Sequence, residues 1–179
     1  STVVELDKQE GRNFFTQMLP KVDVVIENFA PRVMPNFGLD ETTLKLHNPD
    51  LTYVTMPGYG RSGPYKDWVA YGPTIDGHAG HTWLTGYRNE IPWKCGIAWP
   101  DPTAGLHAAA ATLVALLDRQ CCGITGQTVE VAQVETAINM IGQHVVADQF
   151  GGSSQRWGNR RPGRAPQGVY PVSYTHLTL

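Results

Sequence analysis

Asp101 is the residue whose type and position best suit covalent chemistry in this sequence. It precedes Pro102 at the start of an alanine-rich stretch, and Asp-Pro is typical of a helix start, where the carboxylate caps free N–H groups. The helix dipole and the same donors also favour the ionised carboxylate. Small residues (Thr103, Ala104 and Gly105) leave room beside it for a ligand. An ionised carboxylate can attack an activated acyl group, so the cap and the nucleophile both remain as interpretations.

Polar and aromatic residues also follow two predicted strands. Asn28 and Phe29 come directly after an apolar run, so Asn28 could hydrogen-bond a ligand and Phe29 could stack on a ring, unless they only form a turn. The loop GYGRSGPY follows the next run, and its backbone N–H groups and Arg61 could meet phosphates there. Ligands of open α/β sheets bind beyond the carboxyl ends of the strands. As a nucleotide motif the loop is weak, because it is not a G-x-G-x-x-G sequence followed by a helix.

Two further clusters predict no chemistry of their own. The cluster of Asp76, His78 and His81 offers two histidines on one helical face, but zinc needs a third or fourth ligand of defined geometry. We therefore predict no metal site and assign these residues to packing or to the surface. The basic loop near the C-terminus is expected to be solvated or to hold one anion, without binding nucleic acid. Its arginines are Arg156, Arg160, Arg161 and Arg164.

The elements that position these residues alternate between helix and strand. Apolar residues on one helical face predict a helix over residues 10–19, and Asp40 is expected to cap a second helix. Apolar β-branched runs are typical of buried parallel strands. The predicted elements are helices at 10–19, 41–47, 71–84, 102–119 and 133–150, strands at 22–27, 51–56 and 127–132, and loops at 57–64 and 151–167. This order predicts an α/β fold with parallel strands and crossover helices.

Composition and charge restrict the functional class. The chain has 179 residues and a net charge of −2, with a pI of about 6.3, which excludes a strongly basic nucleic-acid-binding protein. The longest apolar run, residues 108–117, is far shorter than the roughly 20 residues of a membrane span, and residues 1–13 contain no secretory signal. The spacing of Cys95, Cys121 and Cys122 fits no zinc pattern. We expect a cytoplasmic protein with reduced thiols and no membrane contact.

Five segments of the chain match a known order of motifs. The most specific is DVVIENFAPRVMPNFGLDETTLKLHNPDLTYVTMPGYGRSGPY, and the others are VELDKQEG, DPTAGLHAAAATLVALLDR, TGQTVEVAQVETAI and GNRRPGRAPQGVYP. Together, from Val3 to Pro171, they resemble the class III CoA-transferase family, the carnitine and formyl-CoA transferase type. The resemblance implies an enzyme that moves CoA from an acyl-CoA to a small carboxylic acid, with the CoA thioester as substrate and no permanently bound cofactor.

The resemblance gives Asp101 the catalytic role, because the family's nucleophilic aspartate opens the corresponding helix. Its carboxylate would attack the acyl-CoA thioester to form a mixed anhydride, and then an aspartyl-CoA thioester from which the acceptor takes CoA. The residues implied to bind CoA are Leu6, Asp7 and Lys8 near the adenine, Asn28, Phe29 and Ala30 after the strand, and Trp68, Val69, Ala70 and Tyr71. Asn36 stands where many members have a basic residue, which places one phosphate contact of the family in question.

The resemblance also implies how the chain is organised. Residues 1–171 correspond to part of a Rossmann-like large domain that binds CoA, and two full-length chains interlink as a homodimer. The first strands and the small domain of the family have no counterpart between Ser1 and Leu179, so we expect a fragment. Residues 172–179 resemble a translated sequencing adapter and are expected to be a non-native tail.

Two other functions remain open. The α-methylacyl-CoA racemases resemble the transferases but pair the aspartate with a histidine, which would fall at Tyr71. A tyrosine is a poor substitute for a base of pKa near 7, so Tyr71 favours a transferase, while His78 nearby keeps a racemase or lyase open. Gly72 stands where many transferases have an acidic residue, so substrate contacts are expected to differ. The last hypothesis is an inactive binding remnant with exposed sheet edges and an exposed apolar face.

Overall fold

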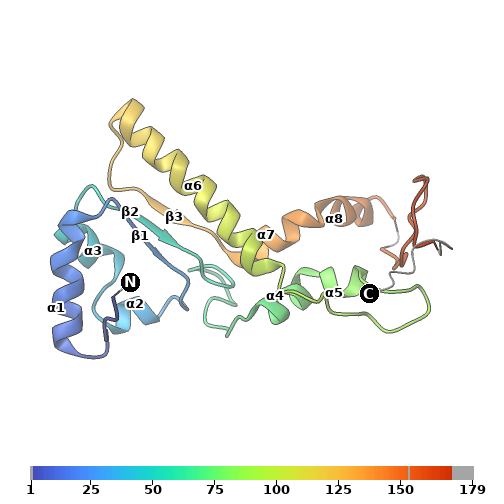
Figure 1. Cartoon of the computed structure of the whole chain (residues 1–179), viewed down its shortest axis with the longest axis horizontal. Helices are drawn as coiled ribbons and strands as arrows, with labels where there is room; N and C mark the ends of the chain where they lie inside the picture. The colour runs from blue at the N-terminus through green and yellow to red at the C-terminus, as the bar shows by residue number, and fades with distance from the viewer. Residues whose placement is uncertain (1, 153, 171–179) are drawn as a thin grey trace, which may run out of the picture.

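A parallel sheet organises the chain. Figure 1 shows the computed structural model, which describes residues 2–152 and 154–170. The strands are β1 (Val24–Glu27), β2 (Thr52–Thr55) and β3 (Thr128–Glu130), in the order β1-β2-β3. Both pairs are parallel, with Val24 opposite Thr52 and Tyr53 opposite Thr128. The predicted α/β fold is confirmed, and the expected non-native tail at 172–179 lies outside the described residues.

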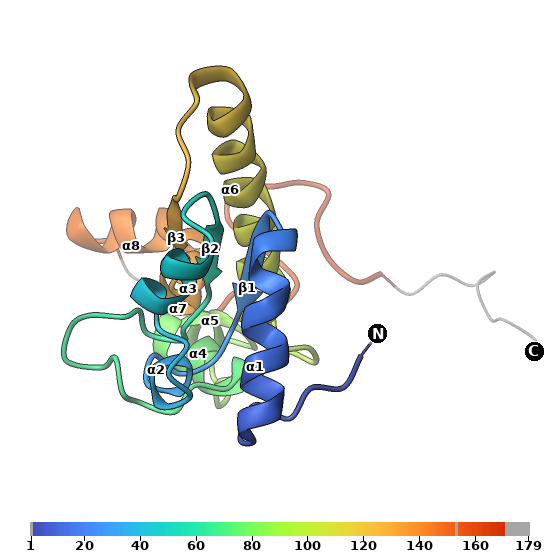
Figure 2. The ribbon, with the colours of Figure 1, turned by 90° about the vertical axis from the view of Figure 1, so that its left-hand side faces the viewer.

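Helices connect and cover these strands. They are α1 (Gln9–Met18), the 3₁₀ helix η1 (Leu19–Lys21), α2 (Val33–Asn36), α3 (Glu41–His47), α4 (Gly72–Ala79), α5 (His81–Leu84), α6 (Pro100–Cys122), α7 (Gln133–Met140) and α8 (Gly142–Gln149). In Figure 1, α1 and α3 lie at the end that holds the sheet, α5 and α8 lie at the other end, and α6 runs obliquely past the strands. Figure 2 shows α1 and α6 from the sheet end.

Both faces of the sheet are packed, because successive strand residues point to opposite sides. On one face, Tyr53 joins a buried cluster and Val25 packs against it; the other members are Leu19, Met34, Leu39, Leu44 and Leu51. On the opposite face, Val54 packs with Ala104 and Ala108 of α6 and with Val131. Burial on two faces explains the continuous apolar run of β2, which is buried along its whole length, whereas the apolar β1 is only partly buried.

The helix ends follow local chemistry with some departures from the predicted bounds. Asp40 caps α3 as predicted, since its carboxylate accepts a hydrogen bond of 2.8 Å from the backbone N–H of Thr43. The predicted helix over 71–84 is divided by Gly80, whose φ of 95° ends α4. The last long helix divides at Ile141, and residues 151–152 and 154–167 contain no helix or strand, as predicted for this loop.

Apolar side chains of α6 and β1 reach the surface of the described chain. Leu106, Leu113, Val114 and Leu117 are each more than half exposed along α6, and so is Ile26 on β1. The described helices include none with both the length and the apolarity needed to cross a membrane.

Candidate active site

Asp101 lies in the first turn of α6, which begins at Pro100, two residues before the predicted start. The residue before the helix, Trp99, makes no side-chain capping bond. Asp101 is exposed, and its carboxylate has no hydrogen bond or ion pair with the residues that the structure describes. Of the two interpretations of Asp101, the simple helix cap is therefore wrong. The carboxylate is free to meet a ligand near the positive end of the helix dipole.

Gly72 fixes the position of this carboxylate. A Cβ atom at residue 72 would lie 2.3 Å from Oδ2 of Asp101 and 2.4 Å from Cβ of Ala98. Both distances are far below van der Waals contact, so only glycine fits against this conformation of Asp101. The first turn of α4 and the first turn of α6 therefore meet at Asp101.

The small residues that follow Asp101 serve packing. Thr103 and Ala104 are buried, with exposed fractions of 7% and 1%. Thr103 Oγ1 donates to the sulfur of Met140 on α7 at 3.0 Å, and Ala104 packs against Val54 of the sheet. The expectation that these two residues leave room for a ligand is wrong, because their size allows α6 to approach α7 and β2. Gly105 is exposed.

A cavity of about 330 Å³ lies at the carboxyl edge of the sheet. It brings together two of the predicted CoA-binding segments, residues 28–30 after β1 and residues 68–71 before α4. Gly58, which also lines the cavity, lies directly against the second segment, since a Cβ at residue 58 would lie 1.9 Å from Cβ of Ala70. Tyr71, which lines the cavity, is followed by Gly72, the residue that lies against the carboxylate of Asp101.

The third predicted CoA-binding segment lies elsewhere. Leu6 packs against the cluster that holds Leu19 and Leu44. The main-chain oxygens of Leu6 and Asp7 each accept a hydrogen bond of 2.9 Å from Arg12. Lys8 forms an exposed ion pair with Glu5 at 2.7 Å and lines a separate cavity of about 410 Å³ near the N-terminus. Residues 6–8 are not among those that line the cavity around residues 28–30.

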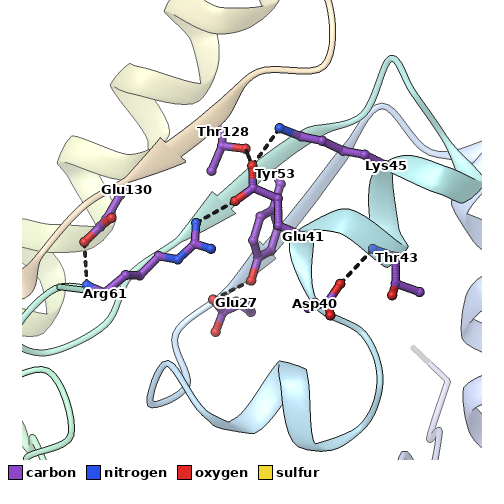
Figure 3. A network of polar contacts seen from close by, with 9 residues as sticks. All are labelled: Glu27, Asp40, Glu41, Thr43, Lys45, Tyr53, Arg61, Thr128 and Glu130. Atoms are coloured by element: carbon purple, nitrogen blue, oxygen red, sulfur yellow. Dashed lines mark hydrogen bonds and ion pairs between the residues drawn. The ribbon is translucent and has the colours of Figure 1, made fainter.

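Arg61 belongs to a polar network that anchors the glycine-rich loop (Figure 3). Its guanidinium donates to Oε2 of Glu41 at 2.8 Å, and its backbone N–H donates to Oε1 of Glu130 at 2.6 Å. Lys45 and Thr128 donate to the other oxygen of Glu41. The prediction that Arg61 meets phosphates is wrong for this arrangement, because its charge is paired with Glu41.

The same network determines the ionisation of Glu41. Partial burial raises the pKa of Glu41, but the hydrogen bonds from Lys45, Thr128 and Arg61 outweigh burial and bring it to about 2. Burial, the charge of Glu27 and the hydrogen bond from its own O–H to Glu27 raise the pKa of Tyr53. Glu41 therefore remains charged and paired at neutral pH.

Asp76 and His81 form a buried pair that joins α4, α5 and α7. Nδ1 of His81 lies 3.3 Å from Oδ1 of Asp76, and Thr82 donates to the other carboxylate oxygen at 3.1 Å. Nε2 of His81 faces the main-chain oxygen of Ala137 at 2.8 Å. Within residues 2–152 and 154–170, no group of three or more His, Cys, Asp or Glu side chains is placed to hold a metal. The packing role expected for His81 and Asp76 is confirmed.

His78 lies in a second cavity, of about 380 Å³. Its Nδ1 contacts the hydroxyl of Tyr59, and the rings of Tyr65 and Trp68 complete an aromatic wall. Val134 also lines this cavity. The contact with Tyr59 engages the imidazole that kept a racemase open as an alternative.

The cysteines form no disulfide, and one arginine of the late basic loop has a structural role. Cys95, Cys121 and Cys122 are free thiols. Arg156 donates to the main-chain oxygens of Trp83, Tyr87 and Glu90 and stacks over the ring of Trp83. It therefore ties the late loop to the segment after α5.

Comparison with known proteins identifies the family of the chain. The model of CoA-transferase family III matches residues 1–179. This chain belongs to CoA-transferase family III. Its α/β fold and the cavity at the carboxyl edge of the sheet are thus features of a family III chain.

Curated relatives and a solved structure agree with the family assignment. An acyl-CoA transferase of Fusarium pseudograminearum is 36% identical over 99% of this chain and 39% of its own length. A succinyl-CoA–D-citramalate CoA-transferase of Chloroflexus aurantiacus is 32% identical over 97% of this chain and 43% of its own. A CAIB/BAIF family protein from Brucella suis superposes with a TM-score of 0.87 and 33% identity, covering 95% of this chain and 45% of that one. The chain spans less than half the length of these relatives.

Three polar residues of this family III chain line the cavity but were not singled out in its sequence. They are Arg32, Lys66 and Gln133. Arg32 and Lys66 each lie two residues from a predicted CoA-binding segment. This proximity in the sequence could have marked them as candidate binding residues. Gln133 begins α7, and its amide donates to the main-chain oxygen of Met56 at 3.0 Å. Only the fold shows that Gln133 reaches the same edge of the sheet.

Proposed function

We propose that the whole protein transfers CoA from an acyl-CoA donor to a small carboxylic acid. One observation carries the proposal: Asp101 presents an unpaired carboxylate that lies against Gly72, and the residue before Gly72, Tyr71, lines the cavity. CoA-transfer reactions need a nucleophile beside the thioester and a cavity for the rest of CoA. The relatives named for succinyl-CoA and acyl-CoA transfer support the substrate class.

The proposed chemistry is a double displacement at Asp101. The carboxylate attacks the thioester carbonyl, and the C–S bond breaks to give a mixed anhydride and CoA thiolate. The thiolate then attacks the aspartyl carbonyl and releases the donor acid as a carboxylate, which leaves an aspartyl-CoA thioester. The acceptor carboxylate attacks this thioester, again forming an anhydride and a thiolate. Attack of the thiolate on the acceptor carbonyl yields the new acyl-CoA and restores the carboxylate of Asp101.

In this proposal the cavity holds the CoA moiety. Asn28 offers amide groups for hydrogen bonding, and the exposed rings of Phe29 and Trp68 offer apolar surface against which the pantetheine arm of CoA can pack. Ala30, Val69 and Ala70 complete the proposed walls. Contacts by Leu6, Asp7 and Lys8 belong to the adenine end of the ligand, outside this cavity. We further propose a cytoplasmic homodimer that needs no permanently bound cofactor.

The test is Asp101→Ala in the whole protein, with CoA transfer between a donor acyl-CoA and an acceptor acid followed by chromatography. Transfer should be lost, while the melting temperature and the affinity for CoA stay unchanged. Asp50→Ala is the matched control, because Asp50 is another exposed aspartate and is not among the residues that line the cavity. Transfer by the Asp101→Ala protein would overturn the proposal. So would deuterium exchange at the acyl α-carbon without transfer, which indicates a racemase.

A further inference from the structure

Two cations line the proposed CoA cavity without an acidic counterpart. Arg32 comes from the turn between β1 and α2, and Lys66 comes from the glycine-rich segment after β2. Both side chains are exposed. Among the described residues around this cavity, no aspartate or glutamate contributes to the lining. The lining therefore carries two positive charges that come from segments far apart in the sequence.

Neither cation is neutralised by the described part of the protein. Arg32 donates only to the main-chain oxygen of Asp67, at a long 3.4 Å, and the ammonium of Lys66 has no hydrogen bond or ion pair there. The carboxylate at the end of β1, Glu27, is already held, since it accepts from Phe29 N–H at 2.7 Å and from Tyr53 O–H at 3.0 Å. Unpaired cations in a concave site raise the local concentration of anionic ligands.

We propose that Arg32 and Lys66 bind the phosphates of the ADP part of CoA, so that the site selects CoA over pantetheine thioesters. This inference rests on the proposed function, because it requires CoA in this cavity. The guanidinium of Arg32 can bind a phosphate through two parallel N–H groups, and Lys66 supplies a compact point charge. The bond from Arg32 to the main chain beside Lys66 holds the two segments together, which brings both charges to one ligand.

Binding measurements on the whole protein test this inference. Calorimetry with CoA, dephospho-CoA and pantetheine would compare the parent with Arg32→Gln, Lys66→Gln and the double variant. Each single variant should weaken CoA binding by about tenfold, and the double variant by about 100-fold. Pantetheine binding should be equal in all four proteins. Arg32→Lys should recover part of the loss, since it keeps the charge but not the paired N–H groups.

The ligand series identifies which phosphates are bound. A loss that persists with dephospho-CoA assigns the cations to the diphosphate, and a loss that disappears with it assigns them to the 3′-phosphate. Affinity of the parent should also fall with rising salt more steeply than affinity of the double variant. Arg88→Gln with Lys94→Gln is the matched control, because both are exposed cations outside the cavity lining, and it should leave CoA binding unchanged.

Other results would overturn either the phosphate-binding role or the proposed function on which it rests. Unchanged CoA affinity in the double variant, or an equal loss for pantetheine, would overturn the phosphate-binding role while the parent still binds CoA. A parent protein that binds no CoA at all would instead overturn the proposed function. A loss in the Arg88→Gln/Lys94→Gln control equal to that in the double variant would reduce the effect to net charge and also reject the assignment.

Discussion

Two aspartates at helix starts illustrate how one residue type serves two purposes in this chain. Asp40 precedes α3 and accepts a hydrogen bond from Thr43 N–H, and this bond lowers the pKa of Asp40. Asp101 lies inside the first turn of α6 and accepts no hydrogen bond from the described residues. The difference comes from their places relative to the helix start: Asp40 is the N-cap and folds back on the first turn, whereas Asp101 is the second residue of its helix. The capping aspartate stabilises the fold, and the free one remains available for chemistry.

The cations show the same contrast. Arg61 is bound to Glu41 and holds the glycine-rich loop against α3, whereas Arg32 and Lys66 line the cavity without a carboxylate partner. Arg61 therefore serves the fold, and the other two cations are available to a ligand. An ion pair with a carboxylate therefore distinguishes a cation that stabilises the fold from the cations that are available to bind a ligand.

The largest effect should come from removing the charge of Asp101, with the same substitution at Asp40 as the comparison. Asp101→Asn should lower kcat on the order of 10³-fold or more, because an amide is no substitute for a carboxylate nucleophile. Asp40→Asn should leave kcat and stability nearly unchanged, because asparagine is an equally good N-cap. Steady-state transfer rates and melting curves of the two variants check this. Equal losses of activity in both would abolish the distinction between the two aspartates.

Gly72→Ala should give the next largest effect. The added methyl group would lie 2.3 Å from the carboxylate of Asp101, so the carboxylate must move, and a displacement of about 1 Å costs up to about 100-fold in rate. The affinity for CoA should change less than kcat, since the cavity lining is retained. Gly77→Ala, with open space around the added methyl group, is the matched control in the same helix and should keep the parent's kcat. A Gly72→Ala protein with the parent's kcat would contradict the close approach.

Glu41→Gln should test the anchoring network through stability. The pKa of Glu41 is lowered from 4.5 to about 2, so its charge stabilises the folded state above pH 4.5, and this contribution is lost as the pH falls toward 2. At pH 7 the variant should lose about 2 kcal/mol of unfolding free energy in urea titrations. The difference from the parent should vanish in acid.

Glu5→Gln is the control for this measurement. Glu5 pairs with Lys8 at the same 2.7 Å as Glu41 with Lys45, but the Glu5 side chain is 59% exposed against 28% for Glu41. Exposed pairs contribute little to stability, so Glu5→Gln should unfold like the parent at every pH. A loss as large as that of Glu41→Gln would show that charge, and not the network, is responsible.

Asp40→Ala should have the smallest effect, confined to stability. Alanine cannot accept the hydrogen bond from Thr43 N–H, so α3 loses its cap. The melting temperature should fall by less than in Glu41→Gln, with kcat unchanged. A fall in kcat would link α3 to the reaction and weaken the separation between fold and site.

The strands and the cap of α3 could be predicted because each depends on neighbouring residues. The apolar runs around Val25 and Val54 are continuous because both sheet faces are packed, and Asp40 is followed at the right spacing by Thr43. The short helix α2 escaped prediction, since it contains Pro35 and lasts one turn. The division at Ile141 was missed although Gly142 directly follows it, because an isolated glycine within a helical pattern is often tolerated.

The site was predictable only in part, because much of it depends on distant contacts. The segments at 28–30 and 68–71 were expected to bind the same ligand, and the structure brings them to one cavity. The pairing of Arg61 with Glu41 and Glu130 joins residues from three elements, and no local spacing indicates it. Gly72 was noted as a departure from the family, whereas its contact with Asp101 appears only when α4 and α6 are placed together.

The contact between Gly58 and Ala70 has a consequence for how the glycine-rich segment can vary. Because a Cβ at Gly58 would lie 1.9 Å from Cβ of Ala70, the segment between them leaves and returns at one point of the sheet edge. A surface loop with adjoining ends can change length without moving the elements that flank it. Insertions around Ser62 and Gly63, both exposed, can therefore diversify the entrance to the cavity while Asp101 and Asn28 keep their places.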